Sequence, residues 1–285
     1  MSGETRNVLV TGCSSGIGYT VALGLSARGY KVFATCRQAD DVDKLRRLGL
    51  DAYQLDLGNH ASIGSAVTQI LEACDNRLFA LFNNGAYGQP GALEDLTTDV
   101  LRQQFETNFF GWHELTRQIL PVMRKNGEGR IIQNSSLLGY VSLPFRGAYN
   151  ASKHAIEGWS DTLRLELALS NTPIHISLIE PGPVTSHFRA NAMRAFQKNV
   201  RVSGSAYELI YQGMINRLNK QGDAAPFTLP PEAVLEKVIH ALESPRPKPR
   251  YYVTVPSYLF GYLKRLLSTR QLDKVLLSVA RRENG

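Results

Sequence analysis

The stretch NVLVTGCSSGIG, residues 7 to 18, decides the fold class. A short apolar run ends in glycine, as a buried strand does, and apolar residues at helical spacing follow from Tyr19 onward. Three glycines, Gly12, Gly16 and Gly18, lie between the two patterns. Glycine lets the backbone turn sharply and approach a pyrophosphate, whose negative charge is favoured at a helix N-terminus. The stretch therefore predicts a strand, a dinucleotide-binding turn and a helix.

The same alternation continues along the chain. Strand-like apolar runs occupy residues 7–12, 31–37, 51–57, 78–84, 129–136 and 174–182. Helical patterns between them include residues 60–73, 97–125 and 150–169. Strands alternating with helices of this length indicate crossover connections and a parallel sheet covered on both faces. We expect one α/β domain with a Rossmann-like, doubly wound parallel sheet, whose ligands bind beyond the carboxyl ends of the strands.

Composition places the chain among ordinary globular proteins. The length of 285 residues suits one large α/β domain, and no run of 18 apolar residues predicts a membrane-spanning helix. The N-terminus lacks the pattern of a signal peptide. The three cysteines, Cys13, Cys36 and Cys74, have no metal-ligand spacing and are expected to be free thiols in a reducing compartment. The histidines show no metal spacing either, so we expect no metal. The free thiols and the missing signal-peptide pattern together indicate a cytoplasmic location.

The end of the second strand indicates which dinucleotide binds. An NAD enzyme typically has an acidic residue there, which bonds the ribose 2′-hydroxyl. This chain has Thr35, Cys36 and Arg37 instead. A guanidinium can bind a 2′-phosphate with two hydrogen bonds, and Ser14 in the glycine turn can add another. We therefore expect NADP(H); the alternative is that Arg37 is only a solvated surface cation.

Residues with acid–base chemistry follow later strands. Tyr149 and Lys153 are four positions apart in a predicted helix, so they share one face. Ser136 ends the fifth predicted strand, and Asn108 lies within the long helical region. A free phenol has a pKa of about 10, and a neighbouring ammonium favours its ionised form. These residues predict that Tyr149 is a proton donor whose pKa is adjusted by Lys153.

In these motifs the chain resembles the short-chain dehydrogenase/reductase family. The matching motifs, in the family's order over roughly residues 7 to 190, are TGCSSGIG, FNNGAYG, TNFFG, NSSLLG, YNASK and PGPVTS. Details such as ATCR and SLPF are similar to the hydroxysteroid and retinol dehydrogenase branch and to bacterial NADP-dependent aldehyde reductases. The resemblance implies that Tyr149 is the general acid and that Lys153 binds the nicotinamide ribose. It implies that Ser136 holds the substrate oxygen and that Asn108 supports a water relay to Lys153.

The resemblance also implies a cofactor-binding set. Its members are Gly12, Ser14, Ser15, Gly16, Ile17, Gly18, Arg37, Asp56, Leu57, Asn84, Gly85, Tyr149, Lys153, Pro181, Gly182, Val184 and Ser186. Asp56 is placed to bond the adenine amino group, and Ser186 the carboxamide, with Thr185 in reserve. The chain departs from the family pattern at Gly85-Ala86, where the family usually has Ala-Gly. This reversal puts the fine cofactor geometry in doubt, because only glycine tolerates a positive φ freely.

The C-terminal part is the least determined. We expect a dinucleotide-binding and catalytic domain over 1–256, with a substrate lid at 187–222, and a basic amphipathic tail over 257–285. The whole net charge of +7 resides in residues 245–285, with nine basic and two acidic side chains. The tail's apolar stripe either docks on the domain or builds an oligomer interface, or the tail lies on an anionic membrane. No nucleic-acid-binding motif is present.

Together these features predict an NADP(H)-dependent oxidoreductase. Apolar segments such as LLGYVSLPF, residues 137–145, indicate a small apolar aldehyde or ketone and its alcohol as substrates. The alternative function is an NADPH-binding redox sensor with little catalysis, which would not need a proton donor. The resemblance implies a homo-oligomer, either a dimer or a tetramer.

Overall fold

The computed structural model of the chain describes residues 5–220, 222 and 225–284. A few positions of the predicted segments lie outside the described residues. They are 1–4 and 223–224 of the domain, 221 of the lid and 285 of the tail.

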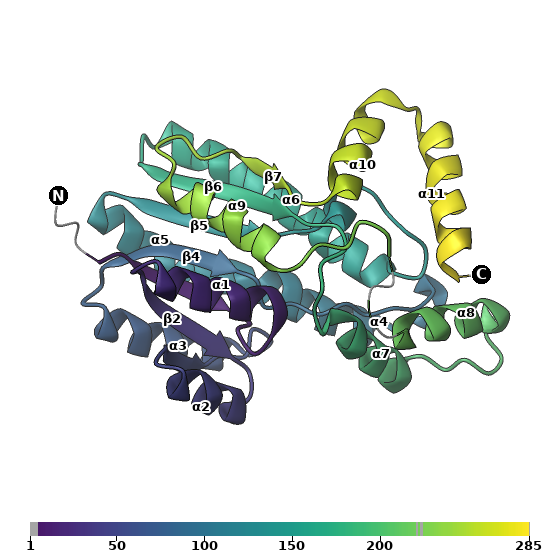
Figure 1. The fold of residues 1–285 in the computed structure, drawn as a ribbon, viewed down its shortest axis with the longest axis horizontal. Coiled ribbons are helices and arrows are strands. Elements are labelled where there is room, and N and C mark those ends of the chain that lie inside the picture. Colours follow the sequence, from purple (N-terminus) through teal and green to yellow (C-terminus); the bar gives the residue numbers. More distant parts are fainter. Residues whose placement is uncertain (1–4, 221, 223–224, 285) are drawn as a thin grey trace.

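The described residues form a parallel sheet in the order β3-β2-β1-β4-β5-β6-β7 (Figure 1). Its strands are β1 Asn7–Thr11, β2 Lys31–Cys36, β3 Asp51–Gln54, β4 Leu78–Asn83, β5 Gly129–Asn134, β6 Ile174–Glu180 and β7 Arg250–Tyr252. The order reverses between β1 and β4. Parallel strands on either side of such a reversal leave a crevice at their carboxyl ends, which is where α/β proteins bind ligands. The predicted doubly wound fold is confirmed.

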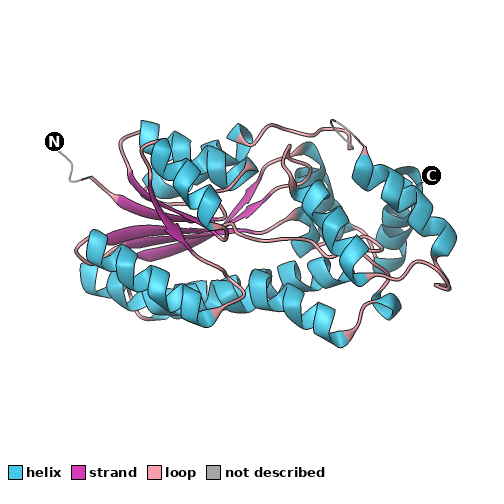
Figure 2. Cartoon of the chain, turned by 90° about the horizontal axis from the view of Figure 1, so that it is seen from below, coloured by secondary structure: helices cyan, strands magenta, loops and turns pink. Residues whose placement is uncertain are grey.

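Helices cover both faces of the sheet (Figure 2). The helices up to the sixth strand are α1 Gly16–Ala27, α2 Ala39–Arg47, α3 His60–Ala73, α4 Thr98–Phe105, α5 Gly111–Asn126 and α6 Gly147–Leu169. Two separate cores result. Helices α1 and α9 Glu232–Glu243 bury one side of the sheet, while α3, α5 and α6 bury the other. This is why the central strands read as almost continuous apolar runs rather than as alternating ones.

Three of the differences from the sequence-based prediction affect the candidate site. Strand β5 ends at Asn134, two residues before Ser136, so Ser136 stands in the loop beyond the sheet edge. Helix α6 begins at Gly147 and not at residue 150, which places Tyr149 in its first turn. The long helical region is interrupted by a π-helical turn at Glu106–Phe110. Hydropathy follows a helix through such a turn, so the sequence pattern does not reveal it.

The C-terminal part adds a layer beyond the sheet edge. It contains α7 Phe188–Asn199, α8 Glu208–Asn219, α10 Val255–Leu266 and α11 Thr269–Asn284. Helices α10 and α11 form a hairpin, and α11 packs against α8 (Figure 1). Helix α10 starts two residues before the predicted tail, because Pro256 occupies its first turn, where a missing N–H costs nothing. A capping interaction is present at the start of α11, since the Ser268 N–H donates to Gln271 Oε1 at 3.0 Å.

Candidate active site

The glycine turn after β1 packs tightly against the turn after β4. The Thr11 hydroxyl accepts hydrogen bonds from the Asn84 and Gly85 N–H groups at 2.8 and 3.0 Å. Gly12 has a φ of +71°, and a Cβ there would lie 2.6 Å from the Gly85 Cα. A Cβ on Gly18 would lie 2.2 Å from the Gly12 carbonyl oxygen. Side chains at these positions would therefore fill the turn or force it apart.

The same turn leaves the N-terminus of α1 available to an anion. Ser15 is the N-cap residue, yet its side chain makes no capping hydrogen bond to the helix. Serine is one of the strongest N-caps, so the uncapped N–H groups are free to bind an external acceptor. Ser14 is exposed beside them and Ile17 is half-buried against the core. This arrangement fits the pyrophosphate of a dinucleotide.

The reversed Gly85-Ala86 pair has a steric explanation. Neither residue has a positive φ. A Cβ on Gly85 would lie 2.8 Å from Leu57 Cδ1, whereas the buried Leu57 side chain fits against the glycine. The position nearest the cofactor turn therefore requires glycine for space, and the exchanged order creates no backbone strain.

The ends of β2 and β3 present opposite charges. Arg37 is exposed immediately after β2, and among the described residues its guanidinium has no ion pair or hydrogen-bond partner. Asp56 follows β3 and its carboxylate accepts the Gly58 N–H at 2.9 Å, which shapes the turn there. An unpaired guanidinium at the end of β2 fits a 2′-phosphate better than a 2′-hydroxyl.

Tyr149 and Ser136 lie together at the carboxyl edge of the sheet. A hydrogen bond links their hydroxyl groups and lowers the pKa of Tyr149, but burial has the larger effect and raises that pKa to about 12. Ser136 is buried, and its hydroxyl also accepts the Leu138 N–H at 3.1 Å. The sequence pattern predicts that the Lys153 charge lowers the Tyr149 pKa; in the structure burial raises that pKa, and the opposing contribution comes from Ser136.

Lys153 is fully buried beneath the tyrosine. Its Nζ donates to the Asn134 carbonyl at 2.7 Å and lies 4.3 Å from the centre of the Trp112 ring. Burial lowers the pKa of Lys153 to about 7, against the opposing effect of the Glu157 charge. A lysine this close to neutrality carries only part of its charge at physiological pH.

Trp112 and Asn108 support this centre from the neighbouring helices. The indole N–H of Trp112 donates to the Gly85 carbonyl at 2.8 Å, so one side chain contacts both the turn after β4 and Lys153. Asn108 lies in the π-helical turn and bonds the Tyr87 backbone at both its N–H and its C=O, at 3.1 and 2.8 Å. Its Nδ2 also reaches the Ser152 hydroxyl at 3.3 Å. π-Helical turns are frequent at functional sites.

A buried acid cluster lies one helical turn beyond Lys153. Arg250 Nη2 is 3.2 Å from a Glu157 carboxylate oxygen and 2.7 Å from Asp161, and Arg250 Nε is 3.1 Å from Glu180. One guanidinium thus faces three acids. Burial and the neighbouring Glu157 charge raise the pKa of Glu180 to about 9, so the Glu157–Glu180 pair keeps one proton near neutrality.

The loop after β6 contacts both the glycine turn after β1 and the segment that follows β5. The buried Pro181 carbonyl accepts the Leu137 N–H at 2.9 Å, and the Gly182 N–H donates to Thr254 at 3.2 Å. Ser186 lies against the glycine turn, since a Cβ on Gly16 would lie 2.9 Å from the Ser186 Cβ. Val184 is half-buried and pairs with Leu229. The predicted residues of this loop therefore meet those of the β1 turn.

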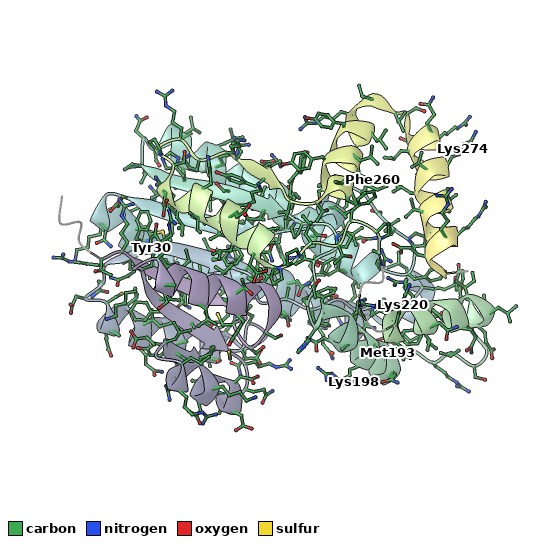
Figure 3. The ribbon with its side chains drawn as sticks, viewed as in Figure 1. Tyr30, Met193, Lys198, Lys220, Phe260 and Lys274 are labelled. Atoms are coloured by element: carbon green, nitrogen blue, oxygen red, sulfur yellow. The ribbon has the colours of Figure 1, made fainter. Side chains whose placement is uncertain are left out.

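Apolar side chains surround the tyrosine on the side away from the cofactor turn. The Phe188 ring meets the Tyr149 ring edge-on, with centroids 5.3 Å apart. Loop residues Leu138, Val141 and Leu143 form one apolar cluster with Phe260 of α10 and with an apolar face of α11. That face consists of Leu272, Val275, Leu276 and Val279. In Figure 3, Phe260 lies on the domain side of α10.

An ion-pair cluster holds α11 in place. Glu283 pairs with Arg146, which precedes α6, and its carboxylate lies 3.9 Å from Arg217 of α8. Burial lowers the pKa of Arg217 to about 10. The predicted tail therefore contacts the domain, next to the start of α6. Sequence reasoning did not identify Glu283, Trp112 or Phe188 as site residues; Glu157 carried a signal, because it is four residues beyond Lys153 on the same helix face.

The fold and this arrangement define a dinucleotide-binding oxidoreductase architecture, and comparison with known proteins agrees. The short chain dehydrogenase family model matches residues 6–196. The oxidoreductase YbbO of Escherichia coli K12 is 44% identical over 271 residues, covering 95% of this chain and 94% of that protein. The NADPH-dependent 3-dehydrocapnine reductase of Ornithobacterium rhinotracheale is 30% identical, covering 95% of each. A short-chain dehydrogenase/reductase from Burkholderia phymatum, solved with NAD, superposes with a TM-score of 0.76 at 25% identity, covering 92% of each chain.

The chain belongs to the short-chain dehydrogenase/reductase family and is an oxidoreductase of that NAD(P)-dependent family. The Ornithobacterium reductase is NADPH-dependent, whereas the Burkholderia protein was solved with NAD. Family membership therefore leaves the cofactor preference open. Among the described residues, no helix is long and apolar enough to cross a membrane.

Proposed function

We propose that the protein is an NADP(H)-dependent reductase of apolar aldehydes or ketones, with Tyr149 as the general acid. The observation that carries the proposal is the convergence of Ser136, Tyr149 and Lys153 at the carboxyl edge of the sheet. They lie between the glycine turn and the apolar cluster that contains Leu138, Val141, Leu143 and Phe260, which we call the apolar wall. When bound, the dinucleotide would supply a hydride to the carbonyl carbon of the substrate. The Tyr149 hydroxyl gives its proton to the carbonyl oxygen, and the product is an alcohol.

The neighbouring residues position this proton. Ser136 is already hydrogen-bonded to the tyrosine, so its hydroxyl can also hold the substrate oxygen. Lys153 stabilises the tyrosinate left after proton transfer and binds the ribose hydroxyls. Asn108 supports a water relay that returns a proton through Lys153, in keeping with its place beside Ser152. Proton donation of this kind typically contributes a factor of about 10² to 10⁴ in rate.

The unpaired Arg37 supports NADP(H) as the cofactor. Asp56 bonds the adenine, Asn84 and Gly85 line the dinucleotide, and Ser186 bonds the carboxamide from the β6 loop. Cys13 does not favour the redox-sensor alternative through its own thiol, because burial raises its pKa and disfavours the reactive thiolate.

The apolar cluster around Tyr149 supports the substrate class, since a charged substrate would lose hydration there without gaining a partner. Residues 187–222, which include α7 and α8, act as the substrate lid, and the enzyme works as a dimer or tetramer in the cytoplasm.

The proposal is tested by NADPH and NADH oxidation with a graded panel of aldehydes and ketones. We expect turnover that prefers NADPH, favours apolar substrates and falls at least 100-fold in Tyr149→Phe, which keeps the ring but lacks the proton. Tight NADPH binding without turnover would instead identify a sensor. A preference for small charged substrates would overturn the assignment of the apolar wall.

The cofactor assignment has a separate test. Arg37→Ser should lower kcat/KM with NADPH about 10- to 100-fold, the loss of one or two charge-assisted hydrogen bonds, and leave NADH turnover unchanged. Arg47→Ser is the matched control, because Arg47 is an exposed cation on the neighbouring helix α2. Equal effects of the two substitutions would show that Arg37 is only a surface charge.

A further inference from the structure

Helix α10 is apolar on two opposite faces. Ser257, Phe260 and Gly261 are buried against the domain. The outward face carries Val255, Tyr258, Leu259, Tyr262 and Leu266, which recur at i, i+3, i+4, i+7 and i+11. All five are exposed, including Leu259 at 52%, Tyr262 at 58% and Leu266 at 79%. A surface helix of a globular protein normally turns polar residues outward, so this outer stripe needs a partner.

The charge around this stripe is positive. The described hairpin from Val255 onward contains six basic and two acidic side chains. Glu283 is used in the ion pairs with Arg146 and Arg217, which leaves Asp273 as the acid exposed on the hairpin. Lys264, Arg265 and Arg270 are exposed at or beside the turn where the stripe ends, and Lys274 projects outward from α11 (Figure 3).

We propose that the outer face of α10 docks on an anionic lipid surface, with the α10–α11 turn and its cations at the headgroups. Leucine and tyrosine on one helix face, bordered by lysine and arginine, are the composition of helices that lie in the membrane interface. The cations complement anionic headgroups. A second copy of the chain is a poorer partner for this stripe, because it would bring the same positive excess to the interface.

The inner side of the same hairpin gives the docking a purpose. Phe260 and the apolar face of α11 belong to the cluster that includes Tyr149. If the proposed apolar substrate is correct, a molecule that partitions into lipid would meet the enzyme next to its site. The docking itself depends on the outer face of α10 and on the cations at the α10–α11 turn, and it is tested without any measurement of activity.

The experiment is flotation of the full-length protein with two kinds of vesicle, phosphatidylcholine alone and phosphatidylcholine mixed with phosphatidylserine. We expect flotation with the mixed vesicles that is lost at high salt, where surface charges are screened. Leu259→Ser/Tyr262→Ser should abolish it. The matched control is Leu48→Ser/Leu209→Ser, which removes exposed apolar side chains from elsewhere on the surface and should leave flotation intact.

Charge variants test the second half of the proposal. Arg265→Gln/Arg270→Gln should weaken partitioning about 25-fold, at about fivefold for each cation near the surface. Lys198→Gln/Lys220→Gln, on and beside the lid helices in Figure 3, should leave it unchanged. Thermal melting of every variant checks that it folds. If Leu259→Ser/Tyr262→Ser does not fold, the single substitution Tyr262→Ser replaces it.

Three results would overturn the proposal. One is equal flotation with neutral and anionic vesicles, and another is no flotation with either. The third is dissociation of an oligomer by Leu259→Ser/Tyr262→Ser in sedimentation velocity, which would make the stripe an interface between copies.

Discussion

Replacing Glu180 by glutamine should make the protein more stable at pH 8 and leave it unchanged at pH 5. Glu180 is completely buried, and its pKa of about 9 stands far above the ordinary value of 4.5. The native state therefore retains a proton that the unfolded chain loses above pH 4.5. The stability tied to this group is fully present at low pH and is lost as the pH rises from about 4.5 to about 9.

The magnitude follows from that interval. Each pH unit between the two pKa values costs about 1.4 kcal/mol, so by pH 8 the wild-type protein has lost up to about 5 kcal/mol. Glutamine resembles the protonated acid and does not titrate. We expect the free energy of unfolding of Glu180→Gln to exceed that of the wild type by about 2 to 5 kcal/mol at pH 8. The lower figure allows for movement of the shared proton between Glu157 and Glu180 in the wild type.

Urea unfolding at pH 5, 6, 7 and 8 measures this difference. The control is Glu243→Gln, because a hydrogen bond from Arg28 lowers the pKa of Glu243, and its contribution is lost only as the pH falls. That variant should show a pH-independent offset across the same range. If Glu180→Gln were less stable than the wild type at pH 8, Glu180 would be an ionised partner of Arg250 and our reasoning would be refuted.

The remaining predictions concern the cofactor turn, the buried lysine and the hairpin. Gly18→Ala should weaken NADPH binding in calorimetry at least tenfold, because its Cβ would lie 2.2 Å from a carbonyl oxygen, whereas Gly64→Ala, with open space around it, should bind normally. Trp112→Leu removes a cation–π contact of about 2 kcal/mol and should lower the pKa of Lys153, so that carbonyl reduction declines with rising pH about 1 to 1.5 units earlier; Trp159→Leu should not. Glu283→Gln leaves the Arg217 cation without its carboxylate and should lower the melting temperature and raise KM, while Asp273→Asn, exposed on the same helix, should change neither.

The fold and the glycine turn after β1 were predictable because their signals are local. The run before Gly12 specifies a buried strand, and the glycines specify the turn that follows. The spacing of Tyr149 and Lys153 specifies one helix face. Each signal depends on neighbours within a few residues, so no knowledge of distant contacts was needed.

The apolar wall was less predictable because its contacts are distant in sequence. Leu276 and Val141 belong to one apolar cluster although more than a hundred residues separate them, and an amphipathic helix shows the same pattern whether it docks on a domain or on a membrane. Trp112 gave no signal, since a buried aromatic residue in a helix usually belongs to the core. The pKa of Lys153 likewise depends on burial, which spacing alone does not describe.

The division of labour along the chain has a practical consequence. The family model ends at residue 196, whereas the wall formed by α10 and α11 begins at Val255, just after the buried Thr254 that bonds Gly182. The last two helices therefore add to the apolar cluster beside Tyr149 from outside the region that the family model matches, whereas Leu138, Val141 and Leu143 contribute to it from inside that region. A library that randomises only the inward positions of the last two helices would vary one part of this apolar cluster without changing any residue of the region that the family model matches.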